Sequence, residues 1–130
     1  MIEVIDTGII PSKGPVNGTV RAGNMVFMAH VPKDPVSGAI VEGDIEVQTR
    51  RALANLKMAV EAAGGSLGHV AQLMIHLIDK EDAAGMNRVY REVMPTPYPS
   101  RATVVVKELL TPGMRIELLA WAVVPTSDKL

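Results

Sequence analysis

The stretch Met114–Val124, which reads MRIELLAWAVV, decides the fold because it is apolar on both sides of a predicted strand. Alternate residues of a strand point to opposite faces of its sheet. One set comprises Ile116, Leu118, Ala120 and Ala122, and the other comprises Arg115, Glu117, Leu119, Trp121 and Val123. Similar two-sided patterns occur at 24–31 and 70–79. These strands therefore predict a sheet that is covered on both of its faces.

The rest of the chain supplies cover for only one face. Apolar residues recur at steps of three and four over 45–63, after the N-cap candidate Asp44 and before a glycine pair, which predicts a helix. A second helix is expected over 81–93, ahead of a proline cluster. Further strands are expected at 16–21 and 101–110. The order predicts an α+β fold with two helices packed on one face of the sheet, so another subunit must cover the other face.

Composition favours a single domain over residues 1–130. With 48% hydrophobic and 21% charged residues the chain can bury a core, and its lack of cysteine excludes disulfides and favours a reducing compartment. A net charge of −1 with 3% aromatic residues disfavours nucleic-acid binding. The N-terminal stretch MIEVIDTG lacks a signal-peptide pattern, and no run is apolar enough to span a membrane, so we expect a cytoplasmic protein.

Two charged residues stand out in otherwise apolar strands. Arg101 opens one strand, where it either forms an intersubunit ion pair with Glu117 or Asp79 or binds a ligand carboxylate through its planar fork. Glu117 shares its face with Leu119 and Trp121, a setting suited to proton transfer. A turn around residues 112–113 is expected to make the two strands antiparallel neighbours, so that Arg101 and Glu117 can share a pocket.

The histidines give no metal-ligand spacing, so no metal site is predicted. His69 and His76 are expected on opposite faces of one strand region, and His30 lies alone.

Several separated motifs agree in order and spacing with one known family. They are Gln48 with Asn55, Asn87 with Tyr90, the run Pro99–Arg101, and Ile116 followed by Glu117. Over about Gly14 to Val124 the chain resembles the RidA/YjgF reactive-intermediate deaminase family, also called endoribonuclease L-PSP.

The resemblance implies a chorismate-mutase-like α+β fold that assembles as a homotrimer with its sites between subunits. It implies hydrolysis of reactive 2-enamino and 2-imino acids, such as 2-aminoacrylate, to 2-keto acids and ammonia, with no cofactor. By the same resemblance Arg101 clamps the substrate carboxylate, Glu117 positions or activates water, and the backbone of Thr103 lies near the substrate nitrogen.

Three departures from the family pattern imply a reshaped and more apolar pocket. Val16 stands where many members have tyrosine, Met28-Ala29-His30 replaces Ser-Gly-Gln, and Ile-Glu-Leu-Leu replaces Ile-Glu-Ile-Glu. Val16, Ala29 and His30 are therefore counted among the substrate-binding positions, with His30 as a new polar group. Two alternatives stay open: a non-catalytic trimeric binder of small carboxylates such as keto acids, and a ribonuclease, which the weak basic character disfavours.

Overall fold

The computed structural model describes residues 1–126 as an α+β domain with one six-stranded sheet in the order β1-β2-β3-β6-β4-β5. The strands are β1 (Glu3–Val4), β2 (Thr19–Ala22), β3 (Met25–His30), β4 (Val70–Leu77), β5 (Ser100–Val105) and β6 (Ile116–Val123). The helices are α1 (Ile45–Ala62) and α2 (Ala83–Val93). Two short 3₁₀ turns, η1 (Leu67–His69) and η2 (Lys80–Asp82), precede β4 and α2 respectively. β5 pairs with β4 in parallel, and every other pair is antiparallel. The predicted α+β class with two helices on one face of the sheet is confirmed, and the trimer stays a prediction.

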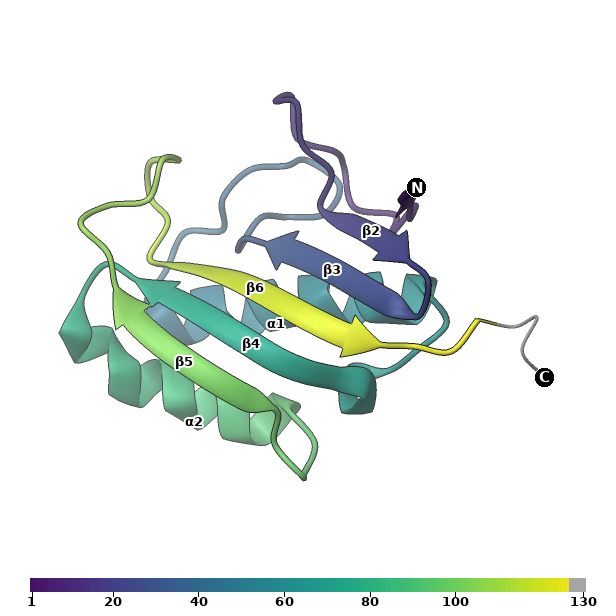
Figure 1. Cartoon of the computed structure of the whole chain (residues 1–130). Helices are drawn as coiled ribbons and strands as arrows, with labels where there is room; N and C mark the ends of the chain where they lie inside the picture. Colours follow the sequence, from purple (N-terminus) through teal and green to yellow (C-terminus); the bar gives the residue numbers. More distant parts are fainter. Residues whose placement is uncertain (127–130) are drawn as a thin grey trace.

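Both helices lie behind the sheet as it is drawn in Figure 1, and the core fills the space between these two layers. From the sheet the core takes Leu73, Ile75, Leu77, Ile116, Leu118, Ala120 and Ala122. From the helices it takes Ala52, Leu53, Leu56, Ala59, Val60, Met86 and Val89. The Asp44 carboxylate accepts a hydrogen bond from the Val47 backbone N–H at 3.0 Å, so α1 begins where the predicted N-cap places it. Within residues 1–126 no helix combines the length and the apolar character that a membrane crossing requires.

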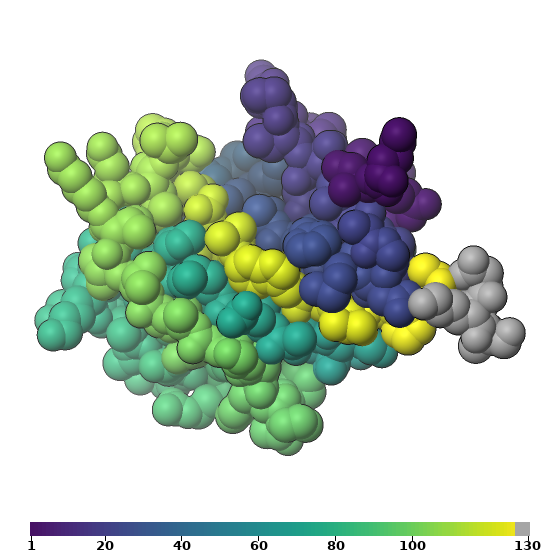
Figure 2. All heavy atoms as spheres, in the orientation of Figure 1, coloured from purple at the N-terminus to yellow at the C-terminus, as the bar shows by residue number. Residues whose placement is uncertain are grey.

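The opposite face of the sheet is largely apolar and has no cover from residues 1–126. Its apolar side chains include Val20, Met25, Phe27, Ala29, Met74, Ala102, Val104, Leu119, Trp121 and Val123, and its polar ones include Gln72, His76, Ser100 and Glu117. Figure 2 shows this open face, with β6 in yellow running between β3 in blue and β4 in teal. Val104 remains 42% exposed and Val123 45% exposed. An uncovered apolar sheet face of this kind marks an interaction surface, and its cover by another subunit stays a prediction.

The predicted pairing of the last two long strands is wrong. β4 lies between β5 and β6, because β5 returns from α2 and pairs in parallel with the outer edge of β4. β5 also ends at Val105, so residues 106–115 form a long connection that carries the chain past β4 to β6. His69 is corrected too, since it belongs to η1 and not to a strand.

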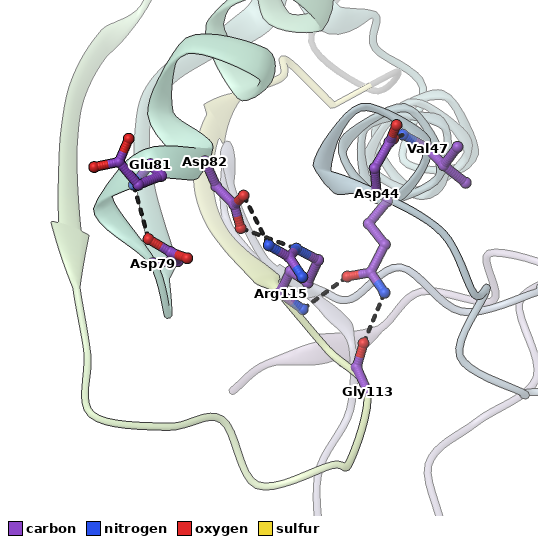
Figure 3. A network of polar contacts seen from close by, with 8 residues as sticks. Asp44, Val47, Asp79, Glu81, Asp82, Gly113 and Arg115 are labelled. Atoms are coloured by element: carbon purple, nitrogen blue, oxygen red, sulfur yellow. Dashed lines mark hydrogen bonds and ion pairs between the residues drawn. The ribbon is translucent and has the colours of Figure 1, made fainter.

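Two motif residues of α1 hold the loops at one end of the sheet. Gln48 is 1% exposed; its Nε2 donates to the carbonyls of Val41 at 3.1 Å and Gly113 at 2.7 Å, while its Oε1 accepts from the Arg115 N–H at 2.7 Å. Asn55 donates from Nδ2 to two further loop carbonyls, those of residues 31 and 33. Figure 3 shows the same region, where the Arg115 guanidinium also forms a two-pronged ion pair with Asp82 at 3.0 and 2.9 Å.

Replacing Gln48 by Leu is expected to destabilise the fold by about 2–3 kcal/mol, because it removes three hydrogen bonds between the buried amide and partly buried backbone groups of two loops. Urea unfolding followed by circular dichroism measures the change. Lys57→Leu, at an exposed position of the same helix, is the matched control and should leave the midpoint nearly unchanged. Equal midpoints for both variants would show that the Gln48 amide does not hold the loops.

Candidate functional site

Arg101 lies at the start of the edge strand β5, on the helix side of the sheet. It is in register with Leu73, which is fully buried, so the two side chains share that side. Its guanidinium carbon lies 4.5 Å from the centre of the Tyr90 ring, and its Nη1 lies 3.8 Å from the sulfur of Met86. Within residues 1–126 no carboxylate lies within ion-pair distance of it.

A cavity of ≈ 200 Å³ opens beside this guanidinium, and we call it the Arg101 cavity. It is lined by Asn87, Tyr90, Arg91, Tyr98, Pro99 and Arg101. The two tyrosine rings lie 5.9 Å apart at 46° to each other, and they form the aromatic wall on which the guanidinium stacks. A partly buried cation beside a cavity with no protein counter-charge is suited to bind an anionic ligand. Of the two predicted roles for Arg101, the intersubunit ion pair stays a prediction, and within residues 1–126 Arg101 pairs with neither Glu117 nor Asp79.

Glu117 lies on the open face of the sheet. Its Oε1 lies 3.5 Å from Nδ1 of His76, its cross-strand neighbour, and its side chain is 34% exposed. Two residues further along β6, Leu119 borders a hollow of ≈ 180 Å³ in the same face. On the sheet this open-face hollow is lined by Val20, Phe27, Ala29, Leu119 and Trp121. The predicted sharing of one sheet face by Glu117, Leu119 and Trp121 is confirmed, but the neighbour that Glu117 contacts is the polar His76.

Arg101 and Glu117 therefore lie on opposite faces of the sheet, with β4 between their strands. The expectation that they share a pocket is wrong for a single chain. A ligand of a few carbons cannot touch both groups unless they come from two different chains.

The other predicted site residues lie either on the side of the sheet that carries Arg101 or near the open-face hollow. Thr103 lies on β5 on the same side as Arg101 and is exposed. Ala29 lines the open-face hollow, and Val16, which is 60% exposed, immediately precedes the loop residues Asn17 and Gly18 at its rim.

The prediction that His30 supplies a polar group to the substrate-binding site is wrong. It is 6% exposed, on the helix side of the sheet, and its Nε2 lies 2.9 Å from the Thr19 hydroxyl. Burial, with a smaller effect of Lys33, lowers the pKa of His30 to about 4. The neighbours Ala29 and His30 must point to opposite faces, so only Ala29 reaches the hollow. The imidazole is a neutral core group.

The sequence did not point to three residues that lie beside Glu117 or line the Arg101 cavity. His76 contacts Glu117 only because β4 and β6 pair in one particular register. Arg91 and Tyr98 line the same cavity as Arg101, because Arg101 contacts Tyr90 and Met86 of α2 and the proline-rich turn connects α2 to β5. Helical spacing of Arg91 from Asn87 was the only sequence signal, and it does not reveal which strand the helix covers.

Comparison with known proteins gives a consistent result. The model of the family described as Endoribonuclease L-PSP matches residues 9–124. A RutC family protein of Pyrococcus horikoshii is 44% identical over 84% of this chain and 88% of its own length. RidA from an Antarctic Psychrobacter has a TM-score of 0.87 at 31% identity, covering 94% of this chain and 99% of that one. Escherichia coli TdcF, solved with bound serine, has a TM-score of 0.83 at 32% identity, covering 93% and 98%.

Proposed function

The chain belongs to the endoribonuclease L-PSP family, which includes the RidA/YjgF proteins, and from this premise we propose that it hydrolyses 2-enamino and 2-imino acids to 2-keto acids and ammonia. The observation that carries the proposal is the Arg101 guanidinium, which borders a cavity and lacks a counter-charge within residues 1–126. Such a group is a carboxylate receptor, and every substrate of this class carries a carboxylate beside its reactive carbon.

The reaction needs little more than orientation and proton handling. An enamine takes up a proton at carbon to become the iminium ion, whose C=N carbon is electrophilic. Glu117 accepts a proton from water as the water oxygen bonds to that carbon, and it then returns this proton to the nitrogen of the resulting carbinolamine. The carbon–nitrogen bond breaks as Glu117 passes the hydroxyl proton to the departing ammonia, which leaves as ammonium together with the keto acid and the ionised Glu117. Fixing the substrate carboxylate on Arg101 sets the geometry for both steps.

The site of this proposal is assembled from two protomers of a homotrimer. One protomer supplies Arg101 and its cavity at the β5 edge, and a neighbour supplies Glu117 and the open-face hollow. The arrangement is supported by the opposite-face positions of the two residues and by the apolar character of the uncovered face. Val16, Ala29 and Leu119 then border the reacting carbon from the neighbour's side.

The activity is tested by generating imino acids in place with an amino-acid oxidase and following keto-acid formation with and without the protein. Acceleration by the wild type that is lost in Glu117→Ala is the expected result. No acceleration across small and branched imino acids contradicts the proposal. A carboxylate binder without activity would show no turnover in the wild type and binding that survives Glu117→Ala.

The two-protomer site predicts complementation between two inactive variants. Arg101→Met and Glu117→Gln, co-expressed with different affinity tags and purified through both tags, form mixed assemblies. Every mixed trimer contains one site in three with both native residues, so about a third of wild-type activity should return. If both residues acted from the same protomer, no site would hold both, and the mixed assemblies would stay as inactive as the parent variants.

A further inference from the structure

The Arg101 cavity has a second arginine in its wall. Arg91 lies in the last turn of α2, directly after Tyr90. The Arg101 guanidinium stacks on the ring of Tyr90. Both arginines line the same ≈ 200 Å³ space. Two positively charged side chains that border one small cavity favour an anionic ligand in it.

The other arginines of the chain find oxygen partners. Arg50, Arg88 and Arg115 pair with Glu92, Glu46 and Asp82 at 2.9, 3.0 and 2.9 Å. Arg21 donates to backbone carbonyls, and Arg51 donates to the Asn55 side chain. Within residues 1–126 only Arg91 and Arg101 have guanidinium groups without an oxygen acceptor. Arg91 and Arg101 also line the same cavity.

We propose that the Arg101 cavity is a two-anion site, which binds the α-carboxylate of a ligand on Arg101 and a second carboxylate at its other end on Arg91. This inference rests on the proposed function and names its substrate class: imino acids derived from dicarboxylic amino acids, and the keto diacids that they yield. Arginine suits both ends because its planar fork pairs with a carboxylate through two parallel hydrogen bonds.

The size and lining of the cavity fit such a ligand. Its ≈ 200 Å³ is below the roughly 300–1,000 Å³ of pockets for drug-sized molecules, so it suits a diacid of about four or five carbons. Tyr90, Tyr98 and Pro99 supply apolar wall for the carbon chain between the two carboxylates, and the Asn87 amide offers one further polar contact.

Binding of two keto acids with equal carbon number tests the proposal. 2-Oxoglutarate carries a second carboxylate, and 2-oxopentanoate has a methyl group in its place. Calorimetry on the wild-type assembly is expected to show the diacid binding at least tenfold more tightly. Arg91→Gln should remove this preference by weakening the diacid about tenfold while leaving the monoacid unchanged.

Arg88→Gln is the matched control, because it removes the same charge from the same helix at a position outside the cavity. It should retain the diacid preference. Equal affinity of the wild type for the two acids overturns the inference, and so does an equal loss of preference in Arg88→Gln, which would indicate a long-range charge effect. Turnover of monocarboxylic imino acids without a diacid preference would leave the proposed function standing and remove only the two-anion site. A diacid preference without any turnover would support the two-anion site and contradict the proposed function.

Discussion

Replacing Arg101 by Met is expected to lower kcat/KM for imino-acid hydrolysis by about 10²–10³-fold. The change removes the guanidinium that stacks on Tyr90 and lines the cavity. Losing one partner of a buried, hydrogen-bonded charge pair costs about 2–5 kcal/mol. The measurement is steady-state hydrolysis of an oxidase-generated imino acid at several substrate concentrations, compared with the uncatalysed rate.

Two further readouts separate this loss from damage to the fold. Arg101 makes no ion pair within residues 1–126, so Arg101→Met should change the melting temperature only slightly, by the loss of its contacts with Tyr90 and Met86. Arg101→Lys keeps the charge and loses the two-pronged geometry, so it should recover less than a tenth of wild-type kcat/KM. Full activity in Arg101→Met would remove the carboxylate clamp from the mechanism.

Acidification from pH 7 to pH 4 is expected to lower the free energy of unfolding by about 3 kcal/mol through His30 alone. The folded-state pKa is lowered to about 4 from an ordinary value of 6.5, so the unfolded chain binds the proton more readily. The stabilisation is fully present above pH 6.5, declines as the pH falls below that value, and is lost once the pH passes below 4. Urea unfolding at a series of pH values measures the slope.

His30→Gln is the variant that isolates this contribution. Glutamine does not titrate in this range, and its amide keeps a hydrogen-bonding group near the Thr19 hydroxyl. The variant is less stable at pH 7, and its stability should change by about 3 kcal/mol less between pH 7 and pH 4 than that of the wild type. Parallel pH curves for the two proteins would mean that folding does not lower the pKa of His30.

Local order along the chain could be predicted from the sequence. The helix expected over 45–63 is α1 at Ile45–Ala62, because its apolar spacing and the Asp44 cap act within a few residues. The alternation in β6 placed Glu117, Leu119 and Trp121 on one face and Leu118 and Ala120 on the other, as the burial pattern confirms. The motif residues that matched the family could likewise be found without coordinates.

What only the tertiary structure decided is how distant segments meet. Strand pairing joins residues far apart in the chain, so no local pattern tells that β4 separates β5 from β6 or that His76 lies beside Glu117. For the same reason the sequence could not tell that Arg101 faces the helices, that His30 is a core group, or that Arg91 enters the Arg101 cavity. A strand's alternation defines two sides, and only packing against the helices decides which side is buried.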